Sequence, residues 1–431
     1  MSLRASKWKA KLPLISWCIY GWASDAFPIL ITTFVFSTYF IQNIATDRII
    51  GTYQWANANT IAGLIIAFTG PLFGALADQG GNHKRWLAFF TYCSIVSTGF
   101  LWFACPSSLC MHSSLTLFII ATICLEIALI FYNSYLLILV SQDYIGRISG
   151  WGWGMGYLGG IISLIIILYL SVHQVSWLNP NTFEPIRIVG PFSALWFTIF
   201  SLPLFLFVPN TAPTQQTLRQ TLYIGLGELA RTAKKLVREK NILLFLFSRM
   251  IYTDGLNTLF AFGGIFAAGT FHFNFTDILL FGISLNILAG VGSISLAWLD
   301  DWLGSKPTIL ISLGLLSLFS LLLLLTHTRL WFWLTAATLS LFIGPVQAAS
   351  RSLMAHLTPL NKSSELFGIY ALTGRITAFM GPWILGVTTL HFQSQRAGMA
   401  TILIFFIVGW LLLWGVNMGS KNCKFKAKRL N

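Results

Sequence analysis

Charged residues are scarce in this chain of 431 residues. Asp, Glu, Lys and Arg together make up 9% of the sequence, whereas 56% is hydrophobic. Soluble domains carry roughly 25% charged residues, so this balance is far from that of a soluble protein. Only 13 of the residues are acidic against 27 Lys and Arg, which gives a formal net charge of +14. The composition indicates a chain that lies largely within a membrane.

Catalytic and metal-binding patterns are also missing. The seven histidines are scattered, and neither an HExxH pattern nor a Cys/His cluster is present. Residues 154–159 formally match a dinucleotide fingerprint, but the run lies inside an apolar stretch with no preceding strand. We interpret Gly152, Gly156 and Gly160 as a flat surface for close helix packing. We therefore expect no enzyme, no metal and no cofactor.

Cysteines give little information. Cys18, Cys93 and Cys124 fall in apolar runs and Cys423 in the basic tail, where we expect reduced thiols. Cys105 and Cys110 lie in the connection between the third and fourth runs. Two interpretations stay open for this pair, a small disulfide on the outer face or two free thiols.

Long apolar runs are what the chain has in abundance. A stretch of about 20 residues with few charges can cross the hydrocarbon core as a helix. We count twelve such runs, at 14–42, 53–77, 86–106, 115–140, 149–172, 190–208, 242–269, 277–299, 307–326, 330–355, 366–390 and 397–418. The first run is too long for a signal core and contains Asp25, so we interpret it as the first span. The predicted fold class is all-α and integral to the membrane.

A charged, glycine-bearing motif follows the second run and returns 223 residues later. We call the two copies the first hinge and the second hinge. The first comprises Gly74, Asp78, Gly81, Lys84 and Arg85, and the second comprises Asp301, Gly304 and Lys306. Such internal repetition is typical of transporters built from two related halves. We predict six-helix bundles at 1–208 and 242–420, a linker at 209–241 and a basic tail at 421–431.

The positions of the lysines predict the orientation. If the N-terminus is cytoplasmic, all thirteen lysines lie on the cytoplasmic side and the opposite loops carry only Arg48, Arg187, Arg329 and Arg396. We therefore expect both termini in the cytoplasm, with basic loops against anionic lipid. The spread of the charge over many loops argues against a nucleic-acid partner. We expect a multi-pass protein of a bacterial inner membrane that works as a monomer.

The linker alternates basic and apolar residues, which suits an amphipathic helix on the inner membrane surface. It can couple the two halves, or it can act only as a tether on lipid headgroups.

Six charged residues lie inside the spans, at least four residues from a span end. Asp25, Glu126, Asp254 and Arg375 fall near the predicted midplane, and Arg249 and Arg351 lie nearer the cytoplasmic side. A charge at the membrane centre costs ~2.5–3.5 kcal/mol on insertion scales, so such residues generally pair or face a cavity. The midplane set is a candidate solute site, and the alternative for each member is a buried structural ion pair.

The hinges resemble those of the major facilitator superfamily. Further stretches resemble its branch of vacuole-effluxer, or autophagy-related amino-acid-effluxer, proteins (unknown major facilitator family 1). These are residues 16–23, Ser149-Gly150 with 156–160, Arg249 to Thr258, residues 350–352, and Phe367-Gly368 with Gly374-Arg375 and Gly381-Pro382. Members of this branch usually carry Tyr-Asp-Trp-Ala-Asn-Ser in the first span. Here the string is Tyr20-Gly21-Trp22-Ala23-Ser24-Asp25, so the carboxylate has moved about one helical turn along the same face.

The resemblance implies twelve helices in two pseudo-symmetric six-helix bundles around a central cavity, working by alternating access. Asp78 can stabilise a neighbouring helix N-terminus and pair with Lys84 or Arg85, and Asp301 with Lys306 offers a weaker equivalent. These contacts form a conformational gate.

For the solute, Arg375 can clamp a carboxylate, and Asp25 or Asp254 can receive an ammonium group. The resemblance adds Tyr20, Trp22 and Tyr252 to this substrate-binding set. Glu126, alone in an apolar span, is the first candidate for a proton carrier and Asp25 the second.

We thus expect a secondary transporter of a small solute, an amino acid or a related zwitterion, with possible proton coupling. A broad exporter of amphipathic compounds and a non-transporting membrane receptor or scaffold remain as alternatives.

Overall fold

The computed structural model describes residues 2–172, 178–210, 238–273 and 275–417, together with scattered positions between 224 and 236. The tail 421–431 and most of the linker 209–241 lie outside the described residues. Every regular element within this part of the chain is a helix. An all-helical chain satisfies its backbone hydrogen bonds within each segment, as the hydrocarbon core requires.

In the described residues up to 210, the chain forms eight α-helices and several short π or 3₁₀ turns. They are α1 (Ser2–Ser24), η1 (Pro28–Phe34), α2 (Phe36–Tyr39), η2 (Phe40–Ile44), α3 (Arg48–Gly80), α4 (His83–Gly99), η3 (Phe100–Phe103), η4 (Ser108–Cys110), α5 (Met111–Leu139), η5 (Gln142–Tyr144), α6 (Ile145–Val172), η6 (Pro180–Thr182), α7 (Glu184–Arg187) and α8 (Val189–Phe207).

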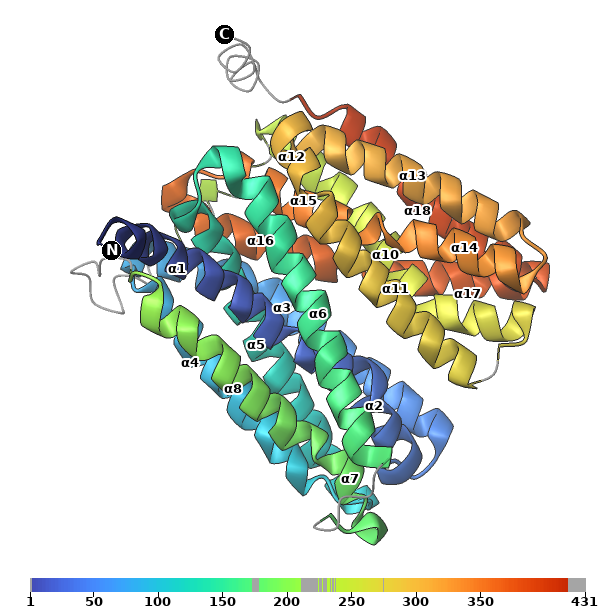
Figure 1. The fold of residues 1–431 in the computed structure, drawn as a ribbon. Coiled ribbons are helices and arrows are strands. Elements are labelled where there is room, and N and C mark those ends of the chain that lie inside the picture. The colour runs from blue at the N-terminus through green and yellow to red at the C-terminus, as the bar shows by residue number, and fades with distance from the viewer. Residues whose placement is uncertain are drawn as a thin grey trace.

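The second half repeats this plan. Its elements are α10 (Lys240–Phe271), α11 (Phe275–Ser295), α12 (Ala297–Leu303), α13 (Ser305–Leu325), α14 (Arg329–Ser340), α15 (Ile343–Leu357), η7 (Leu360–Lys362), α16 (Ser363–Arg375), α17 (Met380–Phe392) and α18 (Gln395–Trp414). Figure 1 shows α1 to α8 as one bundle, in blue to green, and α10 to α18 as a second one, in yellow to red.

Ten helical stretches in the described residues are long and apolar enough to cross a membrane. The other two predicted spans differ from long uniform apolar helices. The span at 242–269 is α10, which carries Arg249 and Asp254. The span at 366–390 is broken, because α16 ends at Arg375 and α17 begins at Met380. Pro382 lies in the first turn of α17, where its missing N–H leaves no helical bond unmade.

Two seams join the bundles. In one, α3 packs against α16, and in the other α6 packs against α11, α12 and α15. A Cβ on Gly74 would lie 2.2 Å from the Ser364 carbonyl oxygen, and a Cβ on Gly368 would lie 2.6 Å from that of Gly70. Only glycine allows the backbones of α3 and α16 to approach this closely.

Aromatic rings fill the interior of each bundle. Trp17 stacks on Tyr132 in the first bundle with ring centroids 4.4 Å apart, and Phe271 lies 4.3 Å from Phe332 in the second. Stacked or tilted rings at such distances stabilise a core beyond the area they bury. These rings hold each bundle together as a unit.

Candidate functional site

Asp25 lies at a break in the first span. The helix α1 ends at Ser24, and the π-helical turn η1 begins at Pro28, which has no N–H to bond the carbonyl of Ser24. The partly buried carboxylate of Asp25 packs against α6, where a Cβ on Gly156 would lie 2.1 Å from Oδ2. Within the described residues no hydrogen-bond donor contacts this carboxylate, and Arg351 and Glu126 interact with it electrostatically.

Glu126 and Arg375 form an ion pair across the two bundles. Arg375 Nη2, at the end of α16, contacts Glu126 Oε1 in the middle of α5. The side chains are 35% and 23% exposed, so the pair is only partly buried. Glu126 is the one charged residue of α5, and its proposed role as a proton carrier stays a prediction. Its partner lies 249 residues away, a distance in sequence that no local pattern reveals.

Arg351 inserts from α15 into the first bundle. It donates from Nε to Ser149 Oγ at 2.9 Å and from Nη2 to the Ser149 carbonyl at 2.5 Å, and Nη1 lies 3.3 Å from Asn133 Oδ1. The guanidinium is also held between aromatic rings, 4.9 Å from the centroid of Trp17 and 5.7 Å from that of Trp153. No ion pair with Arg351 appears in the described part of the chain. Hydrogen bonds and ring faces therefore compensate the buried charge of Arg351 in place of a carboxylate.

The glycine face of α6 brings these charges into register. A Cβ on Gly152 would lie 3.0 Å from Arg351 Nη2, and Gly156, one turn further along, faces Asp25. A cation from one bundle and an anion from the other therefore lie about 6 Å apart along α6. The sequence predicted this face for packing, and the structure shows that it also accommodates two charges.

Asp254 caps the second half of the broken span. Its Oδ2 accepts a hydrogen bond from Gly381 N in the first turn of α17 at 3.0 Å. A carboxylate at a helix N-terminus is stabilised by the backbone dipoles. Its Oδ1 is buried and has no hydrogen-bond partner among the described residues. The predicted contact of Asp254 with an ammonium group stays a prediction.

The predicted aromatic members of the site lie deeper than expected. The Tyr20 hydroxyl pairs with Thr91 Oγ1 at 2.7 Å, and the Tyr252 hydroxyl pairs with Ser350 Oγ at 2.6 Å. The two tyrosines are 0% and 1% exposed, so neither contacts a solute in this conformation. Trp22 is partly buried and stacks on Trp196.

The first hinge holds the start of α16. Asp78 accepts hydrogen bonds from Ser364 N at 3.0 Å and Glu365 N at 2.8 Å. The expected contact with a neighbouring helix N-terminus is therefore present. The pairing with Lys84 or Arg85 was wrong, because His83 Nε2 lies 2.9 Å from Asp78 Oδ1 instead.

The remaining first-hinge residues serve the turn and the bundle itself. Lys84 Nζ donates to the carbonyl of Val208, at the end of α8, at 2.7 Å, and Arg85 is exposed. Gly81, with φ +67°, forms the turn before α4.

The second hinge holds the start of α6. Arg147 N donates to Asp301 Oδ1 at 3.0 Å, and Arg147 Nε lies 3.2 Å from Asp301 Oδ2. The expected pairing of Asp301 with Lys306 was wrong. Lys306 Nζ instead donates to the carbonyls of Trp414 and Val416 at the end of α18. Gly304, with φ +96°, occupies the turn, where a side chain would be strained.

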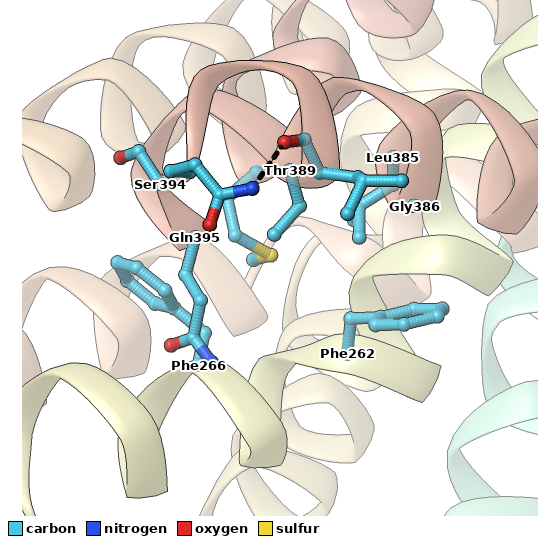
Figure 2. A pocket seen from close by; sticks show the side chains of 10 residues that line it. Phe262, Phe266, Leu385, Gly386, Thr389, Ser394 and Gln395 are labelled. Atoms are coloured by element: carbon cyan, nitrogen blue, oxygen red, sulfur yellow. Dashed lines mark hydrogen bonds between the residues drawn. The ribbon is translucent and has the colours of Figure 1, made fainter.

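Two pockets lie away from the midplane charges. One, of about 490 Å³, is lined by α10, α17 and the start of α18, and Figure 2 shows Phe262, Phe266, Thr389, Ser394 and Gln395 around it. Among the described residues none that lines it is charged, so this lining offers no counter-ion to a charged solute. The other, of about 640 Å³, lies between α1, α5 and α6.

Cys105 and Cys110 are free thiols in the structure.

Comparison with known proteins gives one family. A family model described as "Vacuole effluxer Atg22 like" matches residues 55–424. The chain is 25% identical over 411 residues to the uncharacterized MFS-type transporter YxiO of Bacillus subtilis, covering 92% of this chain and 93% of that protein. It is 26% identical over 321 residues to autophagy-related protein 22-1 of Aspergillus fumigatus, covering 66% of this chain. The chain spans about half the length of that fungal relative.

The fold is also found among solved structures. The structure of the major facilitator superfamily proton:xylose symporter XylE superposes with a TM-score of 0.74 at 13% identity, covering 95% of this chain and 96% of that one. At this identity the likeness concerns the fold alone.

Proposed function

This chain belongs to the vacuole effluxer Atg22-like family of the major facilitator superfamily, and from that premise we propose that it carries an amino acid or a related zwitterion by alternating access. The fold is the major facilitator fold, and the chain is a multi-pass integral membrane protein. Its relatives are transporters, which confirms the prediction that it is not an enzyme. The solute and the coupling are our proposal.

The observation that carries the proposal is the accessible ion pair between Arg375 and Glu126, beside the carboxylate of Asp25. Each end of a zwitterion matches one part of this group. Its carboxylate replaces Glu126 at the planar fork of Arg375, and its ammonium group is received by the freed Glu126 or by Asp25. Exchanging one ion pair for two keeps every charge compensated, which avoids the several kcal/mol that an unpaired buried charge costs.

The exchange also supports alternating access. Glu126 is on α5 of the first bundle and Arg375 on α16 of the second, so their contact ties the bundles together at mid-height. A solute that takes over Arg375 releases this tie, and it can shift the equilibrium only by the difference in its affinity for the two states. Protonation of Glu126 would release the same tie, which is how we propose that protons couple to transport.

The two hinges complete the gate in this proposal. Asp78 and Asp301 each bind the N-terminus of a helix in the opposite bundle, and both contacts close the same end of the molecule. Opening of that end requires both contacts to break.

We propose that the hinge-bearing end faces the cytoplasm. The support is the lysine distribution, since Lys84, Lys306 and Lys362 all lie at this end. Single cysteines can be introduced at residue 431 and near residue 180 and labelled with an impermeant maleimide. The first should react only from the cytoplasmic side and the second only from outside. The reverse pattern would overturn the orientation.

Binding by purified protein tests the solute class. A panel of the twenty amino acids and their amides is screened by thermal shift, because a ligand that binds the folded state raises its melting temperature. At least one free amino acid should stabilise the parent more than its amide does. Arg375→Lys keeps the charge but loses the planar fork, so binding should weaken roughly 10- to 100-fold, as for the loss of a charged hydrogen bond of about 1.5–3 kcal/mol.

Arg396→Lys is the matched control. Arg396 is likewise partly exposed, but its guanidinium binds the backbone carbonyls of Leu324 and Thr326 and lies outside the midplane group. This variant should bind like the parent. If no amino acid stabilises the parent, or if Arg375→Lys binds as the parent does, the zwitterion site is wrong.

A further inference from the structure

The pocket of about 640 Å³ between α1, α5 and α6 is a groove with a charged end and an apolar end. Among its lining residues only Lys11 and Arg147 are charged, and both are basic. From Lys11 the lining continues along α1 to Ile15 and Ile19, and from Arg147 it continues along α6 to Trp151 and Met155. Residues four apart on a helix share a face, so both helices present a cation at the same end and apolar side chains beyond it.

Arg147 retains hydrogen-bonding capacity at this place. Its Nε lies against Asp301, while neither Nη group has a hydrogen-bond partner among the described residues. The side chain is 31% exposed, and its guanidinium lies 5.2 Å from the ring centroid of Tyr144 and 5.6 Å from that of Trp298. A guanidinium fixed between rings, with free N–H groups, is suited to a phosphate.

We propose that this groove binds one anionic phospholipid of the leaflet at the hinge-bearing end. Its phosphate lies between Lys11 and Arg147, and one acyl chain lies along Ile15 and Trp151. Three observations select this occupant over a soluble solute. None of the described residues that line the groove is acidic, its apolar part extends along two membrane-spanning helices, and Ile15 and Tyr144 at its wall are 42% and 48% exposed. The size lies within the roughly 300–1,000 Å³ of known ligand pockets.

The site is connected to the gate. Arg147 belongs to the second-hinge contact, and Ile294 brings a residue of α11, from the opposite bundle, into the lining. Opening of the hinge-bearing end would separate Ile294 from the rest of the groove. The bound lipid therefore distinguishes the closed state from the open one, and by linkage its occupancy shifts their populations.

Native mass spectrometry of the full chain, released from detergent with defined lipids, tests this site. Dioleoyl phosphatidylglycerol and dioleoyl phosphatidylcholine share their acyl chains and differ in headgroup charge. We expect one phosphatidylglycerol to be retained at least tenfold more tightly than phosphatidylcholine. Lys11→Gln should reduce that preference about fivefold, which corresponds to the loss of one basic residue near an anionic headgroup. Free glycerol 3-phosphate should not displace the lipid.

A matched pair of variants locates the acyl chain. Ile15→Trp fills the groove without touching Arg147, and Ile199→Trp places the same side chain on α8, at a residue that is 49% exposed and lines neither pocket. Retention of phosphatidylglycerol should be lost in the first and unchanged in the second, with both melting like the parent. Should Ile15→Trp fail to fold, Lys11→Gln decides. Equal retention of the two lipids, displacement by glycerol 3-phosphate, or equal behaviour of the two Trp variants would each overturn the proposal.

Discussion

In each of the two seams a hinge aspartate binds the start of a helix in the opposite bundle, but the groups that donate to the two aspartates differ. Asp78 receives two backbone N–H groups at the start of α16, whereas Asp301 receives one backbone N–H and the guanidinium of Arg147 at the start of α6. In both copies a lysine, Lys84 or Lys306, binds carbonyls at the end of the last helix of its own bundle. The repeat thus keeps one carboxylate across the seam and one lysine within the bundle.

The close backbone contact has changed sides between the copies. At the hinge position of the first seam the glycine is Gly74, in the hinge-bearing helix, and it faces the Ser364 carbonyl, while Gly368 of α16 faces Gly70 one to two turns away. The residue 223 positions later is Ala297, and there the glycine is in the partner helix, at Gly150, where a Cβ would lie 2.4 Å from that of Ala297. In each close contact of a seam, one of the two facing residues is therefore a glycine, and this glycine can be in either helix.

The largest effect should come from filling these contacts. In Gly74→Ala the new Cβ would overlap a backbone carbonyl, which cannot rotate away, so the closed state should lose about 3 kcal/mol, the upper range for overpacking. The open population should rise roughly 100-fold, measured by spin-label distances across the hinge-bearing end. Gly63→Ala is the control in the same helix, because nothing lies within 4 Å of its Cβ position. A closed Gly74→Ala protein would contradict the seam.

Gly150→Ala should open the other seam to a similar extent. Adding Ala297→Gly should rescue it only in part, since the Ser293 carbonyl oxygen also lies 2.7 Å from the new Cβ. Complete rescue would show that the Ala297 contact alone sets the spacing of α6 from the second bundle.

The two carboxylates should differ by less. Asp78→Asn loses the charge and turns one acceptor into a donor against a backbone N–H, so we expect a loss of about 2 kcal/mol, within the range for charged hydrogen bonds. Asp301→Asn should cost about 1 kcal/mol, because Arg147 is partly exposed to solvent and one acceptor oxygen remains for Arg147 N. Spin-label distances across the hinge-bearing end should therefore show a larger open population for Asp78→Asn than for Asp301→Asn. Equal shifts would mean that the hinges are interchangeable.

The smallest effect should come from Arg147→Gln. The backbone bond from residue 147 to Asp301 survives, and only one partly exposed ion pair is lost, worth about 0.2–1 kcal/mol. His83→Gln, at the first hinge, keeps a hydrogen-bond donor for Asp78 and serves as the matched control. If Arg147→Gln opens as readily as Asp301→Asn, the second hinge depends on the ion pair with the Arg147 side chain and not on the hydrogen bond from the backbone N–H of residue 147.

Local sequence patterns predicted the features that depend on a single segment. Apolar length predicted the spans, and the spacing of Asp78 and Asp301 predicted two related hinges, because both follow from one stretch of chain. The break between Arg375 and Met380 was missed, although Gly374 and Pro382 flank it. Apolar composition continues through the break, so a hydropathy pattern cannot detect it.

The charge partners could not be predicted in the same way. Asp78 was expected to meet Lys84 or Arg85 because they are near in sequence, and the turn at Gly81 instead brings His83 to it. Glu126 is alone in its span, and its partner Arg375 lies in the other bundle, where no pattern within the span can indicate it. Asp254 was grouped with Arg375 by depth alone, whereas the structure uses it to cap α17.

The sequence by itself determined that this is a two-fold repeated membrane protein with charges at mid-depth, because hydropathy and repetition are properties of the chain order. Only the tertiary structure decided which charges meet. Arg375 reaches Glu126, Arg351 reaches Ser149, and Asp78 reaches Ser364 because α5, α6 and α3 pack against helices more than 190 residues away. Depth in the membrane follows from position along a helix, but a partner follows from rotation and packing between helices, which no single segment encodes.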